Sequence, residues 1–239
     1  EHCFTEKNVC EGEPTISALS FPKESHEGFA RVNISFPALS AISMCVRVQW
    51  DRDWNDVSTI FSYAAPVFTN EFQLRGQLDV QGRVLLALII HGKHLPYKAS
   101  FPNDGAWHHI CVTWRRSGNH WAIYVDGESK DTGSGTDTNR DIHGDGILIL
   151  GQDQDSFGGN FTEPFFGNIT DLNVWTMVGC TVEQWLSLLS QSKKATVHVP
   201  AGTFLCGVFH VLPVHVWFFS SHSPKTCLGV SMTLNCSWM

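Results

Sequence analysis

The chain has 239 residues, and its hydrophobic content of 43% is ordinary for a globular core and excludes wholesale disorder. Lysine and arginine number 16 against 23 aspartate and glutamate residues, so the formal net charge is -7. Because this balance is acidic and no basic run occurs, we expect neither a nucleic-acid partner nor adhesion to an anionic membrane surface. A chain of this length holds one large β domain or two small ones.

The cysteines and the glycosylation triplets point outside the cell. The chain has 8 cysteines, and Asn-x-Ser/Thr triplets begin at Asn33, Asn160 and Asn168, with a fourth at Asn235 that has a cysteine in its middle. Single triplets arise by chance, but together with the cysteines they favour an oxidising, glycosylating route. Since the chain begins at Glu1 without an apolar leader, we interpret it as a mature or excised form. The expected location is secreted or on the extracellular side of the plasma membrane.

The first half of the chain has the periodicity of antiparallel strands. Residues 31–36 alternate polar and apolar side chains. Residues 42–50 place five apolar side chains on one face and Cys45 on the other. This longer pattern predicts an antiparallel strand with one face in water. A polar loop follows over 51–59, and the apolar run over 84–90 predicts a strand buried on both sides.

The middle of the chain continues the sheet. Residues 107–114 predict a strand on which His109 and Cys111 lie opposite the main apolar set. Cysteines on matching faces of strands in one sheet can meet at disulfide distance. The alternative for His109 and Cys111 is half of a zinc site, although no second Cys/His pair has ligand spacing. Asp126-Gly127 is a hairpin signal, and the polar residues 130–140 predict a loop.

The last part of the chain changes character. Strands are expected over 147–150 and 165–175, and a capping box that begins at Thr181 predicts a short helix. Residues 204–219 are nearly all apolar. We interpret them as a divergent tail that packs poorly or adds strands. The alternative is a membrane-spanning helix, against which the short run, its two histidines and proline and the polar tail after it argue. A processed lipid-anchor signal fits worse, because the apolar run is not terminal. Six cysteines have no assigned partner from spacing alone: Cys3, Cys10, Cys180, Cys206, Cys227 and Cys236.

The stretch 151–161 concentrates more chemistry than any other. It follows an apolar run, and its three glycines permit turn conformations that are closed to other residues. Two carboxylates, Asp153 and Asp155, lie among side-chain amides. Hard oxygens on an irregular loop are what Ca²⁺ requires, and a cation would relieve the repulsion between the carboxylates. The alternative is a solvated, inert, aspartate-rich turn.

Four segments, in order along the chain, resemble the pentraxin family. The run Gly-Gln-x-Gln-Asp-Ser-Phe-Gly-Gly-Asn-Phe over 151–161 resembles the calcium loop of that family, and residues 109–114 are similar to its pattern His-x-Cys-x-Ser/Thr-Trp. Residues 21–25 resemble its opening strand and residues 60–64 an inner strand. The resemblance extends over about residues 20–190.

The resemblance implies an all-β fold, a two-sheet antiparallel jelly-roll sandwich of the pentraxin or concanavalin type with one short helix. We expect an N-terminal extension over 1–19, a pentraxin-like domain over 20–191 and a divergent tail over 192–239. The resemblance also implies a disulfide between Cys45 and Cys111, which would restrict the unfolded chain by about 4 kcal/mol in the entropy model.

The resemblance also implies a set of calcium ligands. Pentraxins hold calcium through the loop's acid-Gln-Asp trio, an earlier Asp-Asn pair and a downstream Glu and Gln. Carried over by position, the metal ligands are the side chains of Asn70, Asp153 and Asp155 and the backbone carbonyl of Gln154.

Three other ligand positions have lost their oxygen or their charge. Thr69, Thr162 and Phe165 stand where the family has Asp, Glu and Gln. Glu163 would compensate only if the loop shifts. We therefore expect one weak calcium site, with a dissociation constant of about 10⁻⁴ to 10⁻³ M, and too few donors for a second.

The expected function is extracellular recognition of a protein or glycan ligand, assisted by calcium. Phosphocholine is an unlikely ligand, because Arg75 falls where the family's pocket has an apolar side chain and a glycan on Asn160 would cover the ligand surface. We expect no enzyme activity, since no Gly-x-Ser-x-Gly elbow, phosphate loop or His-Glu-x-x-His motif occurs.

Two settings fit this function. In a soluble pentraxin, the family leads us to expect homo-oligomeric rings. The alternative is a truncated ectodomain of a cell-surface receptor, such as an adhesion G-protein-coupled receptor, in which the domain is a calcium-poor protein-interaction module.

Overall fold

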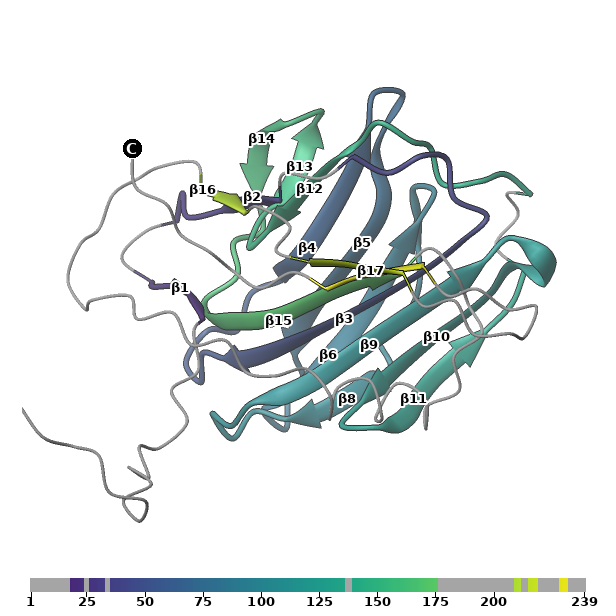
Figure 1. The fold of residues 1–239 in the computed structure, drawn as a ribbon. Helices are drawn as coiled ribbons and strands as arrows, with labels where there is room; N and C mark the ends of the chain where they lie inside the picture. Colours follow the sequence, from purple (N-terminus) through teal and green to yellow (C-terminus); the bar gives the residue numbers. More distant parts are fainter. Residues whose placement is uncertain are drawn as a thin grey trace, which may run out of the picture.

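The computed structural model describes residues 18–23, 26–32, 35–135 and 139–175, and the backbone of three later strands. Figure 1 shows these residues as two large sheets that face each other, with a small hairpin beside them. Each large sheet has eight strands, and the hairpin has two. The expected jelly-roll sandwich is confirmed.

The first sheet has the order β11-β10-β9-β3-β15-β18-β17, with β1 also paired to β15. All of its pairings are antiparallel. Its strands are β1 (Leu19–Phe21), β3 (Ala41–Trp50), β9 (His108–Arg115), β10 (His120–Val125), β11 (Glu128–Gly133), β15 (Gly167–Trp175), β17 (His215–Phe218) and β18 (Leu228–Ser231). A short 3₁₀ turn, η1 (Ser117–Asn119), joins β9 to β10.

The second sheet has the order β16-β2-β12-β4-β5-β6-β7, with β8 also paired to β6. Its strands are β2 (Ala30–Val32), β4 (Ser58–Ala65), β5 (Phe68–Leu78), β6 (Arg83–Ile90), β7 (Lys93–His94), β8 (Ala99–Pro102), β12 (Ile147–Leu150) and β16 (Phe209–Val211). Only β16 runs parallel to its partner, β2. The separate hairpin consists of β13 (Asp153–Ser156) and β14 (Gly159–Thr162).

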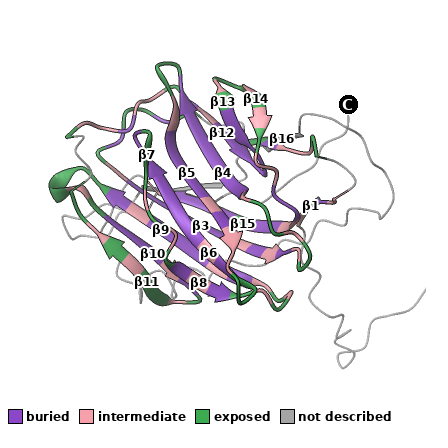
Figure 2. Cartoon of the chain, turned by 180° about the vertical axis from the view of Figure 1, so that it is seen from behind, coloured by how far each residue is buried: buried purple, intermediate pink, exposed green. Residues whose placement is uncertain are grey.

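The core lies between the two large sheets. The apolar face of β3 supplies five side chains that are at most 2% exposed: Ile42, Met44, Val46, Val48 and Trp50. They belong to one cluster with apolar side chains of β5, such as Phe72 and Leu74. The sheets approach so closely that a Cβ on Gly76 of β5 would lie 2.8 Å from the ring of Trp50. Figure 2 shows buried residues along the central strands and exposed residues at the turns.

The opposite face of β3 differs from the prediction. Ser43 and Cys45 are fully buried there, whereas Arg47 and Gln49 are partly exposed. The prediction of one water-exposed face is therefore wrong for the first half of the strand. The reason is that β3 lies between β9 and β15 and carries a disulfide on this face.

Of three other predictions, two are confirmed and one is wrong in its bounds. The hairpin at Asp126 and Gly127 is confirmed, and both residues have positive φ angles, 52° and 83°. The expected loop over 130–140 begins later, because β11 extends to Gly133. Backbone pairing with β10 outweighs the polar composition of this segment. The continuous apolar run of β6 forms a strand that is buried along most of its length, as predicted.

Several predictions lie outside the described residues: the helix after Thr181, the glycosylation site at Asn33, and the six unassigned cysteines. In the later part of the chain, β16 joins the second sheet, and β17 and β18 extend the first. Among the residues that the structure describes, no helix is long and apolar enough to cross a membrane.

Candidate functional site

The predicted calcium loop is a β-hairpin rather than an irregular loop. β13 and β14 pair Asp153 with Thr162 and Gln154 with Phe161, and Gly158 forms the turn with a φ of 74°. β13 lies against β4 and β5. It contacts side chains that alternate with core residues of those strands and therefore point away from the core. The hairpin thus covers the outer face of the second sheet.

Gln154 attaches the hairpin to the sheet. Its side chain is fully buried, and its amide nitrogen donates to the carbonyl oxygens of Ser62 and Ile147 at 3.0 and 3.1 Å. Its side-chain oxygen accepts a bond from the backbone N–H of Gly158. The hydroxyl of Ser62 in turn donates to the carbonyl oxygen of Gln152 at 2.8 Å. The side chain of Gln154 is therefore structural, and only its backbone carbonyl is available as the predicted ligand.

Asp153 is a carboxylate that is only 5% exposed. Its Oδ1 accepts a bond of 2.7 Å from the backbone N–H of Gln154, and the side chain of Gln73 lies beside it. Burial raises the pKa of Asp153, and the charges of Glu163 and Asp155 add to this effect, which outweighs the two hydrogen bonds. Within the described ranges no lysine or arginine contacts Asp153. A cation placed here would relieve the cost of the buried charge.

The other two predicted ligands have different surroundings. Asp155 is exposed, and its Oδ2 accepts a bond of 3.2 Å from the hydroxyl of Thr162. Asn70 lies on β5, and its Oδ1 is buried without a hydrogen-bond partner among the described residues. The structure therefore brings Asp153, Gln154 and Asp155 together on one hairpin, and no hydrogen bond joins Asn70 to them.

Glu163 follows β14, and its carboxylate is paired with Arg75. Nη1 of Arg75 lies 3.0 Å from both carboxylate oxygens. Thr59 donates from its hydroxyl to Oε2 of Glu163 at 3.3 Å and receives a bond of 3.0 Å from the amide of Gln73. Glu163 therefore faces β5 and already has a positive partner, so it does not replace the missing calcium ligands.

The Arg75 side chain is held on a second side by His94. Nη2 donates to Nδ1 of His94 at 2.6 Å, and the guanidinium lies 5.8 Å from the ring centre of Tyr97. Burial and the positive charge of Arg75 lower the pKa of His94, which agrees with a neutral ring that accepts this bond.

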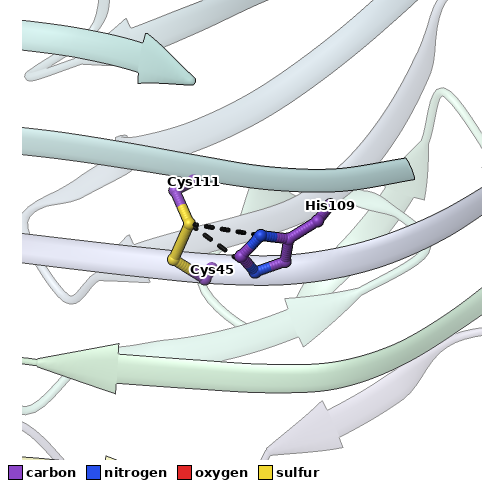
Figure 3. Close-up of side chains that lie close together, drawn as sticks. All are labelled: Cys45, His109 and Cys111. Atoms are coloured by element: carbon purple, nitrogen blue, oxygen red, sulfur yellow. Dashed lines mark hydrogen bonds between the residues drawn. A yellow bond between two sulfur atoms is a disulfide. The ribbon is translucent and has the colours of Figure 1, made fainter. Parts of the chain in front are cut away.

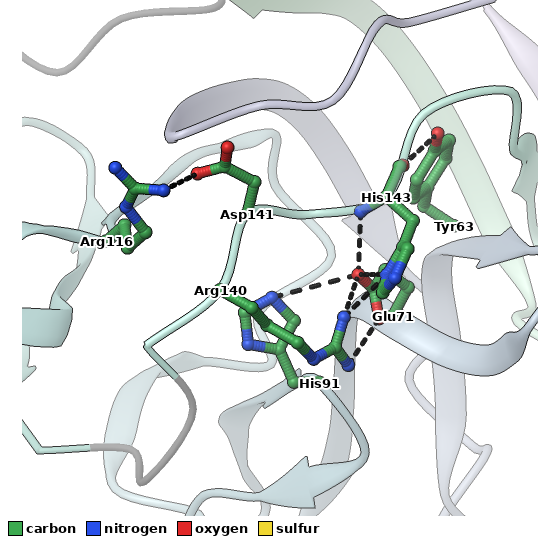
Figure 4. A network of polar contacts seen from close by, with 7 residues as sticks. All are labelled: Tyr63, Glu71, His91, Arg116, Arg140, Asp141 and His143. Carbon is green, nitrogen blue, oxygen red and sulfur yellow. Dashed lines mark hydrogen bonds and ion pairs between the residues drawn. The ribbon is translucent and has the colours of Figure 1, made fainter.

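A buried network around Glu71 lies further along β5 (Figure 4). The side chain of Glu71 is fully buried, and Arg140 donates to both of its oxygens at 2.8 and 3.0 Å. The backbone N–H of His143 donates to Oε1 at 2.8 Å. Burial would raise the pKa of Glu71, but these hydrogen bonds outweigh it and hold the pKa below its usual value. Alternation with Phe72 and Leu74 predicts that Glu71 faces water, so the sequence carries no signal for this buried network.

The predicted disulfide between Cys45 and Cys111 is confirmed (Figure 3). The two cysteines are cross-strand neighbours on β3 and β9. The ring of His109 lies 3.7 Å from Sγ of Cys111, so the three side chains have the proximity of metal ligands. Both sulfurs are bonded to each other, however, and offer no thiolate to zinc.

The asparagines of the two glycosylation triplets in the described residues differ in their exposure to solvent. Asn160 is exposed, has a φ of 47°, and follows the hairpin turn. Asn168 is partly buried on β15, and its Nδ2 donates to Oε1 of Gln49 at 2.8 Å. The structure therefore presents Asn160 to solvent at the calcium hairpin, whereas Asn168 is engaged within a sheet.

The sequence is similar to known proteins over most of its described length. Human adhesion G protein-coupled receptor D2 is 39% identical over 163 residues, which are 67% of this chain and 17% of the receptor. Human neuronal pentraxin-1 is 35% identical over 161 residues, which are 66% of this chain and 35% of that protein. The chain therefore spans only a small part of the receptor and about a third of neuronal pentraxin-1.

The fold agrees with these similarities. A native heptameric SAP-like pentraxin from Limulus polyphemus has a TM-score of 0.59 and 26% sequence identity, over 67% of this chain and 74% of its own. The sequence matches the Pentaxin family over residues 17–197. Because this match covers more than half of the chain and the sandwich agrees with it, the chain belongs to the pentraxin family.

Proposed function

We propose that this chain is an extracellular recognition module that binds a protein or glycan ligand at the β13–β14 hairpin, with the help of one calcium ion. The observation that carries the proposal is Asp153, a buried carboxylate with a raised pKa that no lysine or arginine contacts within the part of the chain the structure describes. Family membership supports recognition rather than catalysis, and we expect no turnover on a panel of glycans.

The described residues fit a single ion. Asp153 and Asp155 supply carboxylates, Gln154 supplies its carbonyl, and Asn70 supplies a buried oxygen that has no hydrogen-bond partner among the described residues. Calcium bound there would supply open coordination positions for hydroxyl or carboxylate oxygens of a ligand. The residues do not fit a second ion, because Glu163 is bonded to Arg75.

Phosphocholine is not the expected ligand. Arg75 places a fixed guanidinium at the position of the family's apolar pocket residue, and like charge disfavours the quaternary ammonium of choline. A glycan on the exposed Asn160 would stand beside the hairpin and narrow the accessible surface further. We expect phosphocholine beads to retain no protein in calcium, and release of retained protein by a chelator would contradict this.

Calcium titration tests the proposed ion site. With a dissociation constant of about 10⁻⁴ to 10⁻³ M, 10 mM calcium stabilises the folded state by about 1.4–2.7 kcal/mol. The melting temperature then rises by about 3–10 °C. Asp153→Asn should abolish this rise. In chelator the same variant should melt above the wild type, because the raised pKa shows that the charged form of Asp153 is disfavoured in the folded state.

Asp56→Asn is the matched control, since Asp56 is an exposed aspartate in the segment between β3 and β4. This variant should keep the calcium response of the wild type. Absence of both a heat of binding and a melting shift for the wild type in millimolar calcium would refute the calcium part of the proposal.

The receptor setting is the second candidate. It is favoured by the 39% identity to human adhesion G protein-coupled receptor D2. In that setting the domain is a calcium-poor protein-interaction module of a larger ectodomain. Molar mass from size-exclusion chromatography with light scattering distinguishes the two settings: a ring supports a soluble homo-oligomeric pentraxin, and a single chain supports the receptor module.

A further inference from the structure

We propose that the guanidinium of Arg75 is a resident cation of the ligand-binding face: it holds the β13–β14 hairpin on the sheet without a metal ion and occupies the place of a second calcium. The part of this inference that concerns the number of calcium ions rests on the proposed function, whereas the part that concerns metal-free order does not.

A continuous chain of side chains carries the inference. It runs from Arg75 to Glu163, from Glu163 to Thr59, and from Thr59 to Gln73. Gln73 lies beside Asp153 of β13, so both ends of the hairpin are connected to the outer face of β4 and β5. The backbone repeats this connection, because the N–H of Thr59 donates to the carbonyl of Glu163 at 2.8 Å.

The ion pair is less accessible than a typical surface pair. The side chains of Arg75 and Glu163 are 13% and 29% exposed, whereas exposed pairs contribute little because water screens them. One guanidinium nitrogen contacts both carboxylate oxygens, and the other is fixed by His94. Charge-assisted bonds of this kind are about twice as strong as neutral ones.

The backbone of Glu163 is also specialised for this contact. Its φ is 49°, in the left-handed region that residues other than glycine seldom adopt. The surrounding contacts must stabilise this conformation, and the bonds to Arg75 and Thr59 are the ones that the structure provides. The conformation turns the carboxylate toward β5.

The consequence is a division of roles between two acids. Glu163 has a positive charge within the protein, so it needs no ion. Asp153 is only 5% exposed and contacts no lysine or arginine among the described residues, so an ion is still favourable there. The hairpin should therefore be ordered in chelator and should bind no more than one calcium ion.

Hydrogen exchange in EDTA tests the metal-free part. We expect the wild-type hairpin amides over 153–162 to be protected. In Arg75→Gln and in Glu163→Gln they should exchange about tenfold or more faster, the loss expected for a hydrogen bond to a charged group. The double variant should exchange no faster than either single one. Arg83→Gln is the matched control, because the half-exposed Arg83 pairs with Asp79 at the turn between β5 and β6, and it should leave the hairpin unchanged.

Amides of β3 and β9 report in the same experiment whether each variant is folded. Glu163→Gln preserves the volume of the side chain, so this variant still tests the inference if Arg75→Gln does not fold. The inference is overturned if either folded variant exchanges like the wild type, or if the wild-type hairpin is unprotected until calcium is added. Calorimetry gives the number of ions: two ions bound to the wild type would overturn the second part, whereas none would refute the proposed calcium site and leave the exchange result standing.

Discussion

His91 illustrates how a single buried side chain can set the pH dependence of the fold. It follows β6, packs edge-on against Trp114 with ring centres 5.1 Å apart, and lies 3.7 Å from Glu71. Burial lowers its pKa to about 4, against an ordinary value of 6.5, although the charge of Glu71 opposes the shift. The ring is therefore neutral in the folded protein at neutral pH.

The sign of the pH effect follows from this shift. Between pH 6.5 and about 4 the unfolded chain takes up a proton at His91 that the folded chain does not. The contribution of His91 to the free energy of unfolding is therefore complete above pH 6.5. It is lost as the pH decreases toward 4, so the protein becomes less stable. Melting temperatures measured from pH 7.0 to pH 4.5 should decrease accordingly.

His91→Asn is the informative variant, because asparagine does not titrate and tolerates the φ of 52° at this position. Its melting temperature should depend less on pH over the same interval. Glu71 adds to the decrease only at the lower end of this interval, since its pKa is lowered from an ordinary value of 4.5. An unchanged pH profile in the variant would show that other groups dominate this interval, such as His109, whose pKa is also lowered by burial.

At the scale of elements, charged residues attach peripheral segments to the second sheet. Glu163 attaches the β13–β14 hairpin to β5 through Arg75, and Glu71 attaches the segment before β12 to the same strand through Arg140 and His143. Each acid is turned toward a donor from a distant part of the chain. Both contacts position the surface at which ligand binding is proposed.

Glu71→Gln tests the second of these attachments. The variant leaves Arg140 without its charged partner next to a fully buried side chain. We expect the free energy of unfolding to fall by about 3 kcal/mol, the usual cost of removing one partner of a buried ion pair. Urea denaturation monitored by tryptophan fluorescence measures this change.

Glu128→Gln supplies the comparison. Glu128 pairs with Lys130 on the exposed strand β11, where the loss should be less than about 1 kcal/mol. Equal losses in the two variants would mean that Arg140 finds water in place of Glu71, and that the network contributes little.

At the scale of the whole molecule, the disulfide joins two central strands of the first sheet. It links Cys45 and Cys111 across a sequence separation of 66 residues. Replacing both cysteines by alanine should lower the free energy of unfolding by about 4 kcal/mol in the chain-entropy model. Guanidinium denaturation checks this value. Wild type measured with reductant should approach the variant, and a midpoint that neither change alters would contradict the expectation.

The sandwich could be predicted from the sequence because its signals are local or repeated. Alternation along β3, the apolar run of β6 and the turn at Asp126 each determine one element. The order of four family-like segments then supplies the topology. Burial of Ser43 was not predictable, because it depends on which strands flank β3 and not on the alternation within it.

For the candidate site, the sequence predicted which residues could be ligands but not the structure that positions them. Asp153 and Asp155 stand in a recognisable run, but the hairpin that carries them depends on pairing with Thr162 and on the anchoring of Gln154. The partnership of Arg75 with Glu163 joins residues from separate strands, and no spacing rule connects them. Sequence patterns show which groups are present, whereas neutralisation of one group by another requires the three-dimensional arrangement.

The pairing of β16 with β2, and of β18 with β15, has a practical consequence for shortened versions of this protein. A recombinant product that ended at residue 191 would lack β16, β17 and β18, so β2 and part of β15 would each present a bare row of N–H and C=O groups. Such rows recruit strands from neighbouring molecules. Aggregates or oligomers of the truncated protein would therefore result from the truncation. The oligomeric state should be measured on protein that retains residues 209–231.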